Sequence, residues 1–284
     1  MKNILKLIRV NQWSKNILIF FPLLFGLGDF GQIFDLLFGF FLFSIIASSI
    51  YIFNDLIDKD EDKRHPLKSE RPIASGKISD RNAYIILSLF LSTSLVTSYL
   101  FLPVGGFRII LIYLALNLIY SLVLKKILIL DLVLLSNFYL LRIIFGSTFF
   151  DTEISGWLLI FTNFFFLALV SLKRLSEIRS LSNNVSSIKS YVKNDEIFFI
   201  IVSIGSALCS VIFYSLYLSN MLDGLDGMNF ILLTIPILMV SYLRLILILV
   251  RGGMAVDPLS FVFKDVPTLI YVVVFLAIFY FGIG

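Results

Sequence analysis

Long runs of apolar residues, separated by short polar connections, make up most of this chain of 284 residues. The runs are continuously apolar, whereas the strands of a membrane barrel would alternate apolar and polar positions, so the pattern predicts helices. A helix of about 20 residues crosses a bilayer. We therefore expect nine transmembrane helices, near residues 13–28, 33–53, 83–102, 107–124, 127–149, 156–172, 197–219, 228–250 and 267–283.

The distribution of lysine and arginine predicts the orientation of this bundle. Basic residues, Arg9 among them, precede the first span, and others follow the second, fourth, sixth and eighth, while 27–35, 149–157 and 219–229 contain none. By the positive-inside rule the N-terminus is then cytoplasmic and the C-terminus outside; an eight- or ten-span count would break the alternation. We expect an all-α, multi-pass protein of the cell membrane, with one transmembrane domain over 1–284 and its charged loops in the cytoplasm.

Composition agrees with a membrane protein. Hydrophobic residues make up 59% of the chain and charged residues 15%, a balance typical of helices that satisfy their backbones in lipid. The net charge of +4 follows from basic residues parcelled among loops, so we expect no nucleic-acid partner. Cys209, the single cysteine, has no partner for an internal disulfide, and the single histidine, His65, lacks partners for a protein-only metal site.

The acidic segment from Asn54 to Asp62, directly after the second span, is the most informative polar stretch. If the helix continues through it, Asn54, Asp55, Asp58 and Asp62 fall within about 100° of one another and share one face. Crowded carboxylates repel unless a cation holds them, and oxygen-rich clusters suit Mg²⁺ bridged to phosphates. A simply solvated loop is the alternative. The spacing favours a Mg²⁺ site formed by Asp55, Asp58 and Asp62.

Basic residues follow these acids. Lys68 and Arg71 stand beside Pro72 and Gly76, which predict a shaped turn rather than continued helix. Cations beside a metal-diphosphate would cover the charge that the metal leaves uncompensated. The alternative for both residues is anchoring of the loop at the inner membrane surface, which any lysine or arginine would provide.

Charges at the ends of other spans are open to two interpretations. Lys173, Arg174 and Glu177 form either an anion site or a surface pair of Lys173 with Glu177, worth roughly 0.3–0.5 kcal/mol. Arg142 lies inside the fifth span, where an unpaired charge costs several kcal/mol, so a functional or buried-pair role is favoured over lipid exposure. Arg244 is nearer a span end and is placed to snorkel.

Several further polar groups have a simpler default interpretation. Trp13 and Tyr120 are expected first as interfacial aromatic anchors. The Asp223 and Asp226 pair lies in a glycine-rich connection on the predicted exterior side, and we interpret it as a loop.

The pattern Asn54-Asp55-x-x-Asp58-x-x-x-Asp62 resembles the first aspartate-rich motif of the UbiA superfamily of intramembrane prenyltransferases, whose fold agrees with nine spans and cytoplasmic loops. At the position of that superfamily's second acidic motif, this chain has Lys173-Arg174-x-x-Glu177. That departure resembles one branch, the decaprenyl-phosphate phosphoribosyltransferases. The stretches that carry this second resemblance are Gln12-Trp13-x-Lys15-Asn16, the run from His65 to Gly76, Tyr120 with Lys125, Asp131, Leu141-Arg142, Lys173-Arg174 and the loop from Arg251 to Asp265.

The resemblance implies transfer of 5-phosphoribosyl from phosphoribosyl diphosphate to a polyprenyl phosphate, with Mg²⁺ held by Asp55, Asp58 and Asp62 at the cytoplasmic side. Lys15, Lys68 and Arg71 would bind the donor, and Lys173, Arg174 and Arg142 the lipid phosphate. The lipid phosphate is already ionised, so no general base is required. The full set of implied substrate-binding residues is Gln12, Lys15, Asn16, Asn54, Lys68, Arg71, Tyr120, Lys125, Arg142, Lys173, Arg174 and Glu177.

Two other functions remain open at this point. A prenyltransferase that moves a polyprenyl group from its diphosphate to an aromatic acceptor would use the same first motif and the same metal. A transporter would place charges and broken helices near the midplane, often in duplicated halves, whereas these acids cluster at one interface and the chain has no clear repeat.

Overall fold

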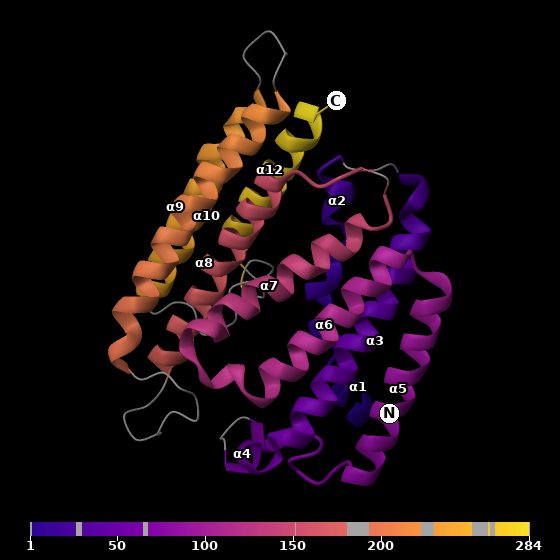
Figure 1. Cartoon of the computed structure of the whole chain (residues 1–284). Helices are drawn as coiled ribbons and strands as arrows, with labels where there is room; N and C mark the ends of the chain where they lie inside the picture. The colour runs from indigo at the N-terminus through magenta and orange to yellow at the C-terminus, as the bar shows by residue number, and fades with distance from the viewer. Residues whose placement is uncertain are drawn as a thin grey trace. The chain divides into compact units, whose positions relative to one another are not determined.

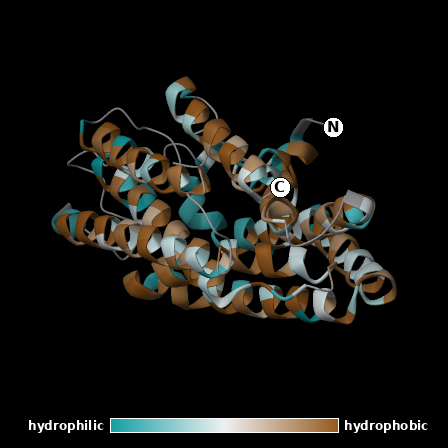
Figure 2. Cartoon of the chain, turned by 90° about the horizontal axis from the view of Figure 1, so that it is seen from above, coloured by the Kyte–Doolittle hydropathy of each residue, from teal (hydrophilic) through white to brown (hydrophobic). Residues whose placement is uncertain are grey.

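The computed structural model describes residues 2–26, 30–64, 68–150, 152–180, 193–222, 230–251, 261 and 265–283. These residues are helical almost throughout (Figure 1), and hydrophobic residues dominate every long helix (Figure 2), which confirms the predicted all-α membrane fold. Among the described residues, seven helical segments are long and apolar enough to cross a membrane. They are α3 (Ile33–Ile57), α5 (Asp80–Phe101), α6 (Val104–Leu122), α7 (Leu128–Ser147), α8 (Gly156–Ser180), α9 (Glu196–Met221), and η6 (Phe230–Leu233) continued by α10 (Thr234–Val250).

The two ends of the predicted bundle differ from these seven segments. The first apolar run is a 3-10 helix, η1 (Val10–Phe20), followed by the short α2 (Phe21–Leu24), and the last is the shorter α12 (Val266–Ile283). Pro22 has no N–H to donate to Leu18, four residues back, which works against a continuous α-helix over 13–28. The count of nine spans and the cytoplasmic N-terminus stay predictions.

Contacts divide the chain into two compact units, which are described separately below. Unit 1 comprises residues 1–125 and 141–153, and unit 2 comprises residues 126–140 and 154–284, so that α7 contributes to both. The predicted single domain stays a prediction.

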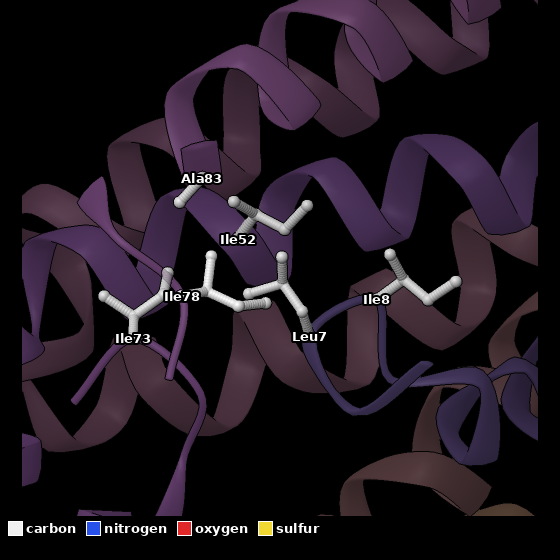
Figure 3. Close-up of a cluster of buried hydrophobic side chains, with 6 residues drawn as sticks. All are labelled: Leu7, Ile8, Ile52, Ile73, Ile78 and Ala83. Carbon is white, nitrogen blue, oxygen red and sulfur yellow. The ribbon is translucent and has the colours of Figure 1, made fainter. Parts of the chain in front are cut away.

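In unit 1, α3 is the central helix, packed against η1, α5 and α6. The N-terminal helix α1 (Lys2–Leu7) and the loop after α3 are attached to the end of α3 by an apolar cluster (Figure 3). Because this cluster holds both segments, it places their charged side chains beside the polar end of α3. Its buried members are Leu7, Ile8, Ile52, Ile73, Ile78 and Ala83.

Gly146 of α7 allows a close backbone contact in unit 1. A Cβ atom at this position would lie 1.9 Å from the carbonyl oxygen of Ile19 in η1. Only a residue without a side chain fits there, so Gly146 sets how closely this part of α7 approaches η1.

In unit 2, α8 and α9 pack side by side along their length (Figure 1), and α10 packs against α12. Arg244 of α10 donates to Asp265, just before α12, at 2.9 Å, and its expected snorkelling stays a prediction. Asp265 also accepts from the backbone N–H of Thr268, at 3.0 Å, and from its hydroxyl at the start of α12. These bonds, the hydroxyl bond first, hold the pKa of Asp265 below its ordinary value.

Candidate functional site

The predicted acidic site lies at the end of α3, but its backbone differs from the expected one. The helix ends at Ile57, Asp58 follows at φ −87° and ψ 8°, and residues Lys59–Arg64 form a separate short helix, α4. The prediction of a single helical face through Asn54, Asp55, Asp58 and Asp62 is therefore wrong. The acids are instead grouped by side chains that reach them from elsewhere in unit 1, a tertiary effect that helix geometry alone does not contain.

Arg71 joins two of the acids. Its NH1 group donates to Asp55 at 3.0 Å and to Asp62 at 2.6 Å, and both carboxylates are only 2% exposed. Lys68, in the 3-10 turn η3 (Lys68–Glu70), lies 3.9 Å from Asp62. The turn that presents Arg71 has the predicted shape, because Gly76 takes the left-handed φ of 73°.

The third acid pairs with a cation from another helix end. Lys125, in the 3-10 turn η4 (Leu124–Lys126), lies 2.5 Å from Asp58. Tyr120 lies half-buried in the last turns of α6, just before that turn. Six of the predicted site residues thus form two separate sets of ion pairs. One set contains Asp55, Asp62, Lys68 and Arg71, and the other is the pair of Asp58 with Lys125.

The donor set of this site fits a hard divalent cation. The side-chain oxygen of Asn54 is buried and, within the described part of unit 1, has no hydrogen-bond partner. With the three carboxylates beside it, the site offers only oxygen ligands, which Mg²⁺ prefers. No group of three acidic, histidine or cysteine side chains in the described residues encloses a metal by itself. Mg²⁺ is commonly bound by one or two carboxylates together with substrate phosphates, and the fit is of that kind.

Arg9 is a member of this site that sequence reasoning missed. Its guanidinium pairs with Asp55 and stacks over the ring of Tyr51, 4.8 Å from the centroid. In the sequence Arg9 is one of several basic residues before the first span, so it carries the same signal as a membrane anchor.

A second polar network in unit 1 surrounds Arg142. Its Nε donates to Asn16 at 2.8 Å and its NH2 to the hydroxyl of Tyr113 at 3.1 Å, while Asn16 donates to Ser44 at 2.9 Å. Arg142 is 4% exposed, so the buried role was predicted correctly. Ser44 lies eleven residues before Asp55 on α3, a separation of about 16 Å. Asn16 and Arg142 are thus brought to each other, away from the acids, and their role as substrate ligands stays a prediction.

The other predicted residues of η1 are Gln12 and Lys15. Gln12 and Lys15 are half-buried, and the backbone N–H of Gln12 donates to the carbonyl oxygen of Arg9 at 2.8 Å. Trp13, expected as an interfacial anchor, donates from its indole N–H to Ser48 of α3 at 3.0 Å.

In unit 2, Arg174 is held by two carboxylates. Its Nε and NH2 bind Asp131 in a bidentate pair at 2.7 and 2.8 Å, and its NH1 binds Glu177 at 2.8 Å. Arg174 and Asp131 are both nearly fully buried, whereas Lys173 is half-buried and Glu177 is 35% exposed. Asp131 therefore orients Arg174, and Glu177, expected also as a partner of Lys173, binds Arg174. Sequence reasoning did not assign Asp131 to the site, because 43 residues separate the pair.

Several predicted positions lie outside the described residues. They are His65, Asp223, Asp226 and most of the loop between Arg251 and Asp265.

Seven long apolar helical segments, together with an aspartate site edged by cations, define a multi-pass membrane protein with a polar site at a helix end. The sequence matches the model of the UbiA prenyltransferase family over residues 17–251. The chain belongs to this family of membrane transferases.

Two curated proteins are similar to this chain over most of its length. Decaprenyl-phosphate phosphoribosyltransferase of Mycobacterium tuberculosis is 30% identical over 269 residues, which cover 92% of this chain and 88% of that protein. The uncharacterized protein y4nM of Sinorhizobium fredii is 35% identical over 223 residues, or 77% of this chain, and the match spans 43% of that longer protein.

Solved structures share the fold. A UbiA homolog from Archaeoglobus fulgidus bound to DMAPP and Mg²⁺ superposes with a TM-score of 0.71 at 18% identity, covering 98% of both chains. A structure of digeranylgeranylglyceryl phosphate synthase gives a TM-score of 0.64 at 18% identity. At this identity the likeness establishes the fold alone.

Proposed function

We propose that this protein transfers 5-phosphoribosyl from phosphoribosyl diphosphate to a decaprenyl-like polyprenyl phosphate and releases diphosphate. The reaction would require Mg²⁺ and take place at the cytoplasmic side of the cell membrane. The observation that carries the proposal is the buried Arg174, fixed by Asp131 and Glu177, where the resemblance expects a second acidic motif. Basic side chains there, Lys173 and Arg174, offer N–H donors to an anionic acceptor lipid, and the match to the M. tuberculosis relative named for this activity covers most of the chain.

The residues at the end of α3 would bind the donor. Carboxylates of Asp55, Asp58 and Asp62, the amide oxygen of Asn54 and phosphate oxygens of the donor would together hold Mg²⁺, with one or two carboxylates on an ion. The metal, when bound, would draw charge from the leaving diphosphate. Arg71 and Lys68 now neutralise the carboxylates. When those oxygens turn to a metal, the same N–H groups are available to phosphate oxygens, with charge-assisted bonds of similar length.

Lys125, which pairs with Asp58, would exchange its carboxylate for a phosphate oxygen in the same way. Lys15 completes the predicted donor set, and Gln12 and Tyr120 are proposed as further substrate-binding residues. A lysine is suited to this exchange, because its ammonium is a compact point charge on a flexible stem and can follow a phosphate over some distance.

The acceptor needs no proton removed. An ionised lipid phosphate oxygen forms a bond to C1 of the ribose, and the C1–diphosphate bond breaks with its electron pair leaving on the diphosphate. Lys173 would bind the lipid phosphate, and Arg174, fixed by Asp131, would keep positive charge beside it. Arg142 is proposed as a further ligand of the lipid phosphate through the polar network it shares with Asn16.

A direct assay tests the proposal. Purified protein in detergent is incubated with Mg²⁺, labelled phosphoribosyl diphosphate and polyprenyl phosphates, and label is expected in the organic phase. Asp55→Asn and Asp62→Asn should abolish transfer. Asp60→Asn is the matched control in the same acidic segment, because Asp60 is 82% exposed and pairs only at the surface with Lys63, 3.1 Å away. Equal activity in all three variants would refute the site.

The second candidate is transfer of a polyprenyl group from its diphosphate to an aromatic acceptor. It is favoured by the family match and by the bound DMAPP in the A. fulgidus homolog. The same preparation distinguishes the two, since a prenyltransferase would consume a polyprenyl diphosphate and leave labelled phosphoribosyl diphosphate in the aqueous phase.

A further inference from the structure

Arg9 adopts a backbone conformation that is unfavourable for its residue type. Its φ and ψ are both 51°, in the left-handed region, and no other non-glycine residue in the described ranges has a positive φ. A long side chain rarely occupies this region, and such strain persists where surrounding contacts determine the backbone on both sides.

Contacts with α3 hold the chain on either side of Arg9. Before it, Leu7 and Ile8 are buried in the apolar cluster with Ile52 (Figure 3), and the hydroxyl of Ser48 donates to the carbonyl oxygen of Ile8 at 2.8 Å. After it, the indole N–H of Trp13 donates to the same Ser48. The N-terminal segment is thus fixed to α3 at two points, and the strained turn between them directs the side chain of Arg9 toward the polar end of α3.

Arg9 and Arg71 converge on a single atom. The NH2 of Arg9 and the NH1 of Arg71 both donate to Oδ1 of Asp55. The ring of Tyr51 supports the guanidinium of Arg9 from one side. Two guanidinium groups that meet at one anionic oxygen have the arrangement needed to bind one phosphate oxygen between them.

The charge of the site leads to the same conclusion. Among the ion pairs of this site in the described part of unit 1, three carboxylates meet four cations, of which Arg9 is one. A divalent cation on the carboxylates would leave a positive excess. Each phosphate group of a ligand supplies about one to two negative charges at neutral pH, and so restores the balance.

We propose that Arg9 is a diphosphate-binding residue, which exchanges its bond to Asp55 for a bond to a phosphate oxygen of the substrate. The inference rests on the proposed function in taking the ligand to be a diphosphate, and it assigns to the N-terminal segment the task of presenting this arginine. It does not depend on whether the diphosphate carries a ribose or a prenyl group.

Binding of inorganic diphosphate in the presence of Mg²⁺ tests the inference on the full chain in detergent, by calorimetry. Arg9→Gln is expected to weaken binding about 10- to 100-fold, the range for loss of a charge-assisted contact. Arg9→Lys is expected to weaken it about threefold or more, because an ammonium replaces neither the fork of donors nor the stacking on Tyr51. Lys6→Gln is the matched control, since Lys6 is an exposed cation of the same segment, and should bind like the wild type.

A purely structural role gives a different result. In that case Arg9→Gln lowers the thermal unfolding temperature of the ligand-free protein but leaves the dissociation constant within twofold of the wild type, and the inference is overturned. If Arg9→Gln does not fold, Arg9→Lys decides by the same criterion.

The binding and transfer experiments together distinguish a failure of the proposed function from a failure of the role of Arg9. If the wild type binds diphosphate through Arg9 but transfers a prenyl group and no phosphoribosyl, the proposed reaction is wrong and the role of Arg9 stands.

Discussion

The close contact between Gly146 and η1 predicts that a larger residue at position 146 destabilises unit 1. In Gly146→Ala the added methyl group would lie 1.9 Å from the carbonyl oxygen of Ile19, whereas ordinary contact begins at 3.4 Å, so the two segments must separate by about 1.5 Å. Arg142 is one turn before Gly146 and Asn16 one 3-10 turn before Ile19. The same separation would lengthen their hydrogen bond of 2.8 Å to about 4.3 Å, beyond bonding range.

The expected magnitude follows from three terms. Overpacking costs about 1–3 kcal/mol, and loss of a hydrogen bond from a buried cation costs a further 1.5–3 kcal/mol, approximately. The higher helix propensity of alanine offsets about 1 kcal/mol. The free energy of unfolding should therefore fall by roughly 2–5 kcal/mol, which corresponds to a Tm lowered on the order of 10 °C.

The assay is thermal unfolding of purified protein in detergent, with Gly205→Ala as the matched control. Gly205 lies on the exposed face of α9, and a Cβ there meets no atom within 4 Å. The control should unfold at or slightly above the wild-type temperature. If Gly146→Ala unfolds together with Gly205→Ala, the close approach of η1 to α7 is not present in the protein, and the reasoning fails.

Three further predictions concern single interactions. Asp131→Asn leaves the buried Arg174 without its bidentate partner and should lower the free energy of unfolding by about 3–5 kcal/mol, measured by thermal unfolding. Replacement of both Asp131 and Arg174 by Leu should recover most of the loss. A double variant as unstable as the single one would contradict the buried ion pair. The pKa of Asp265 is held below its ordinary value of 3.8, chiefly by the Thr268 hydroxyl. Its contribution to the free energy of unfolding is therefore complete above pH 3.8 and is lost as the pH falls through the lowered pKa. Asp265→Asn should remove this part of the acid sensitivity, and a Tm-versus-pH curve equal to that of the wild type would contradict the prediction. Chelation of divalent metal should abolish phosphoribosyl transfer and Mg²⁺ should restore it, whereas undiminished transfer would exclude the metal role proposed for Asp55.

Local features of the sequence determined the class of structure and the position of the site. Continuous apolar runs satisfy their backbones in lipid only as helices, so the all-α membrane fold follows from composition and run length. The turn at Gly76 follows from the conformational preference of glycine. Asn54, Asp55, Asp58 and Asp62 lie near the end of α3 because they are close in the sequence, and their role as a site stays a prediction.

The tertiary structure alone decided which polar partner each arginine meets. Arg9 is 46 residues from Asp55, and Arg142 is 126 residues from Asn16. In the sequence Arg9 looks like its basic neighbours, a positive charge before a span, and the positive-inside rule applies to all of them equally. Arg142 differs because it lies inside a span, which predicts a buried role but does not name its partner. Which polar partner each arginine reaches depends on packing between distant segments. Leu7 and Ile8 pack against Ile52 and so bring Arg9 to Asp55, and Gly146 packs against η1 and so brings Arg142 to Asn16. Helix periodicity also does not predict where a helix ends, and for that reason the break at Asp58 appeared only in the folded chain.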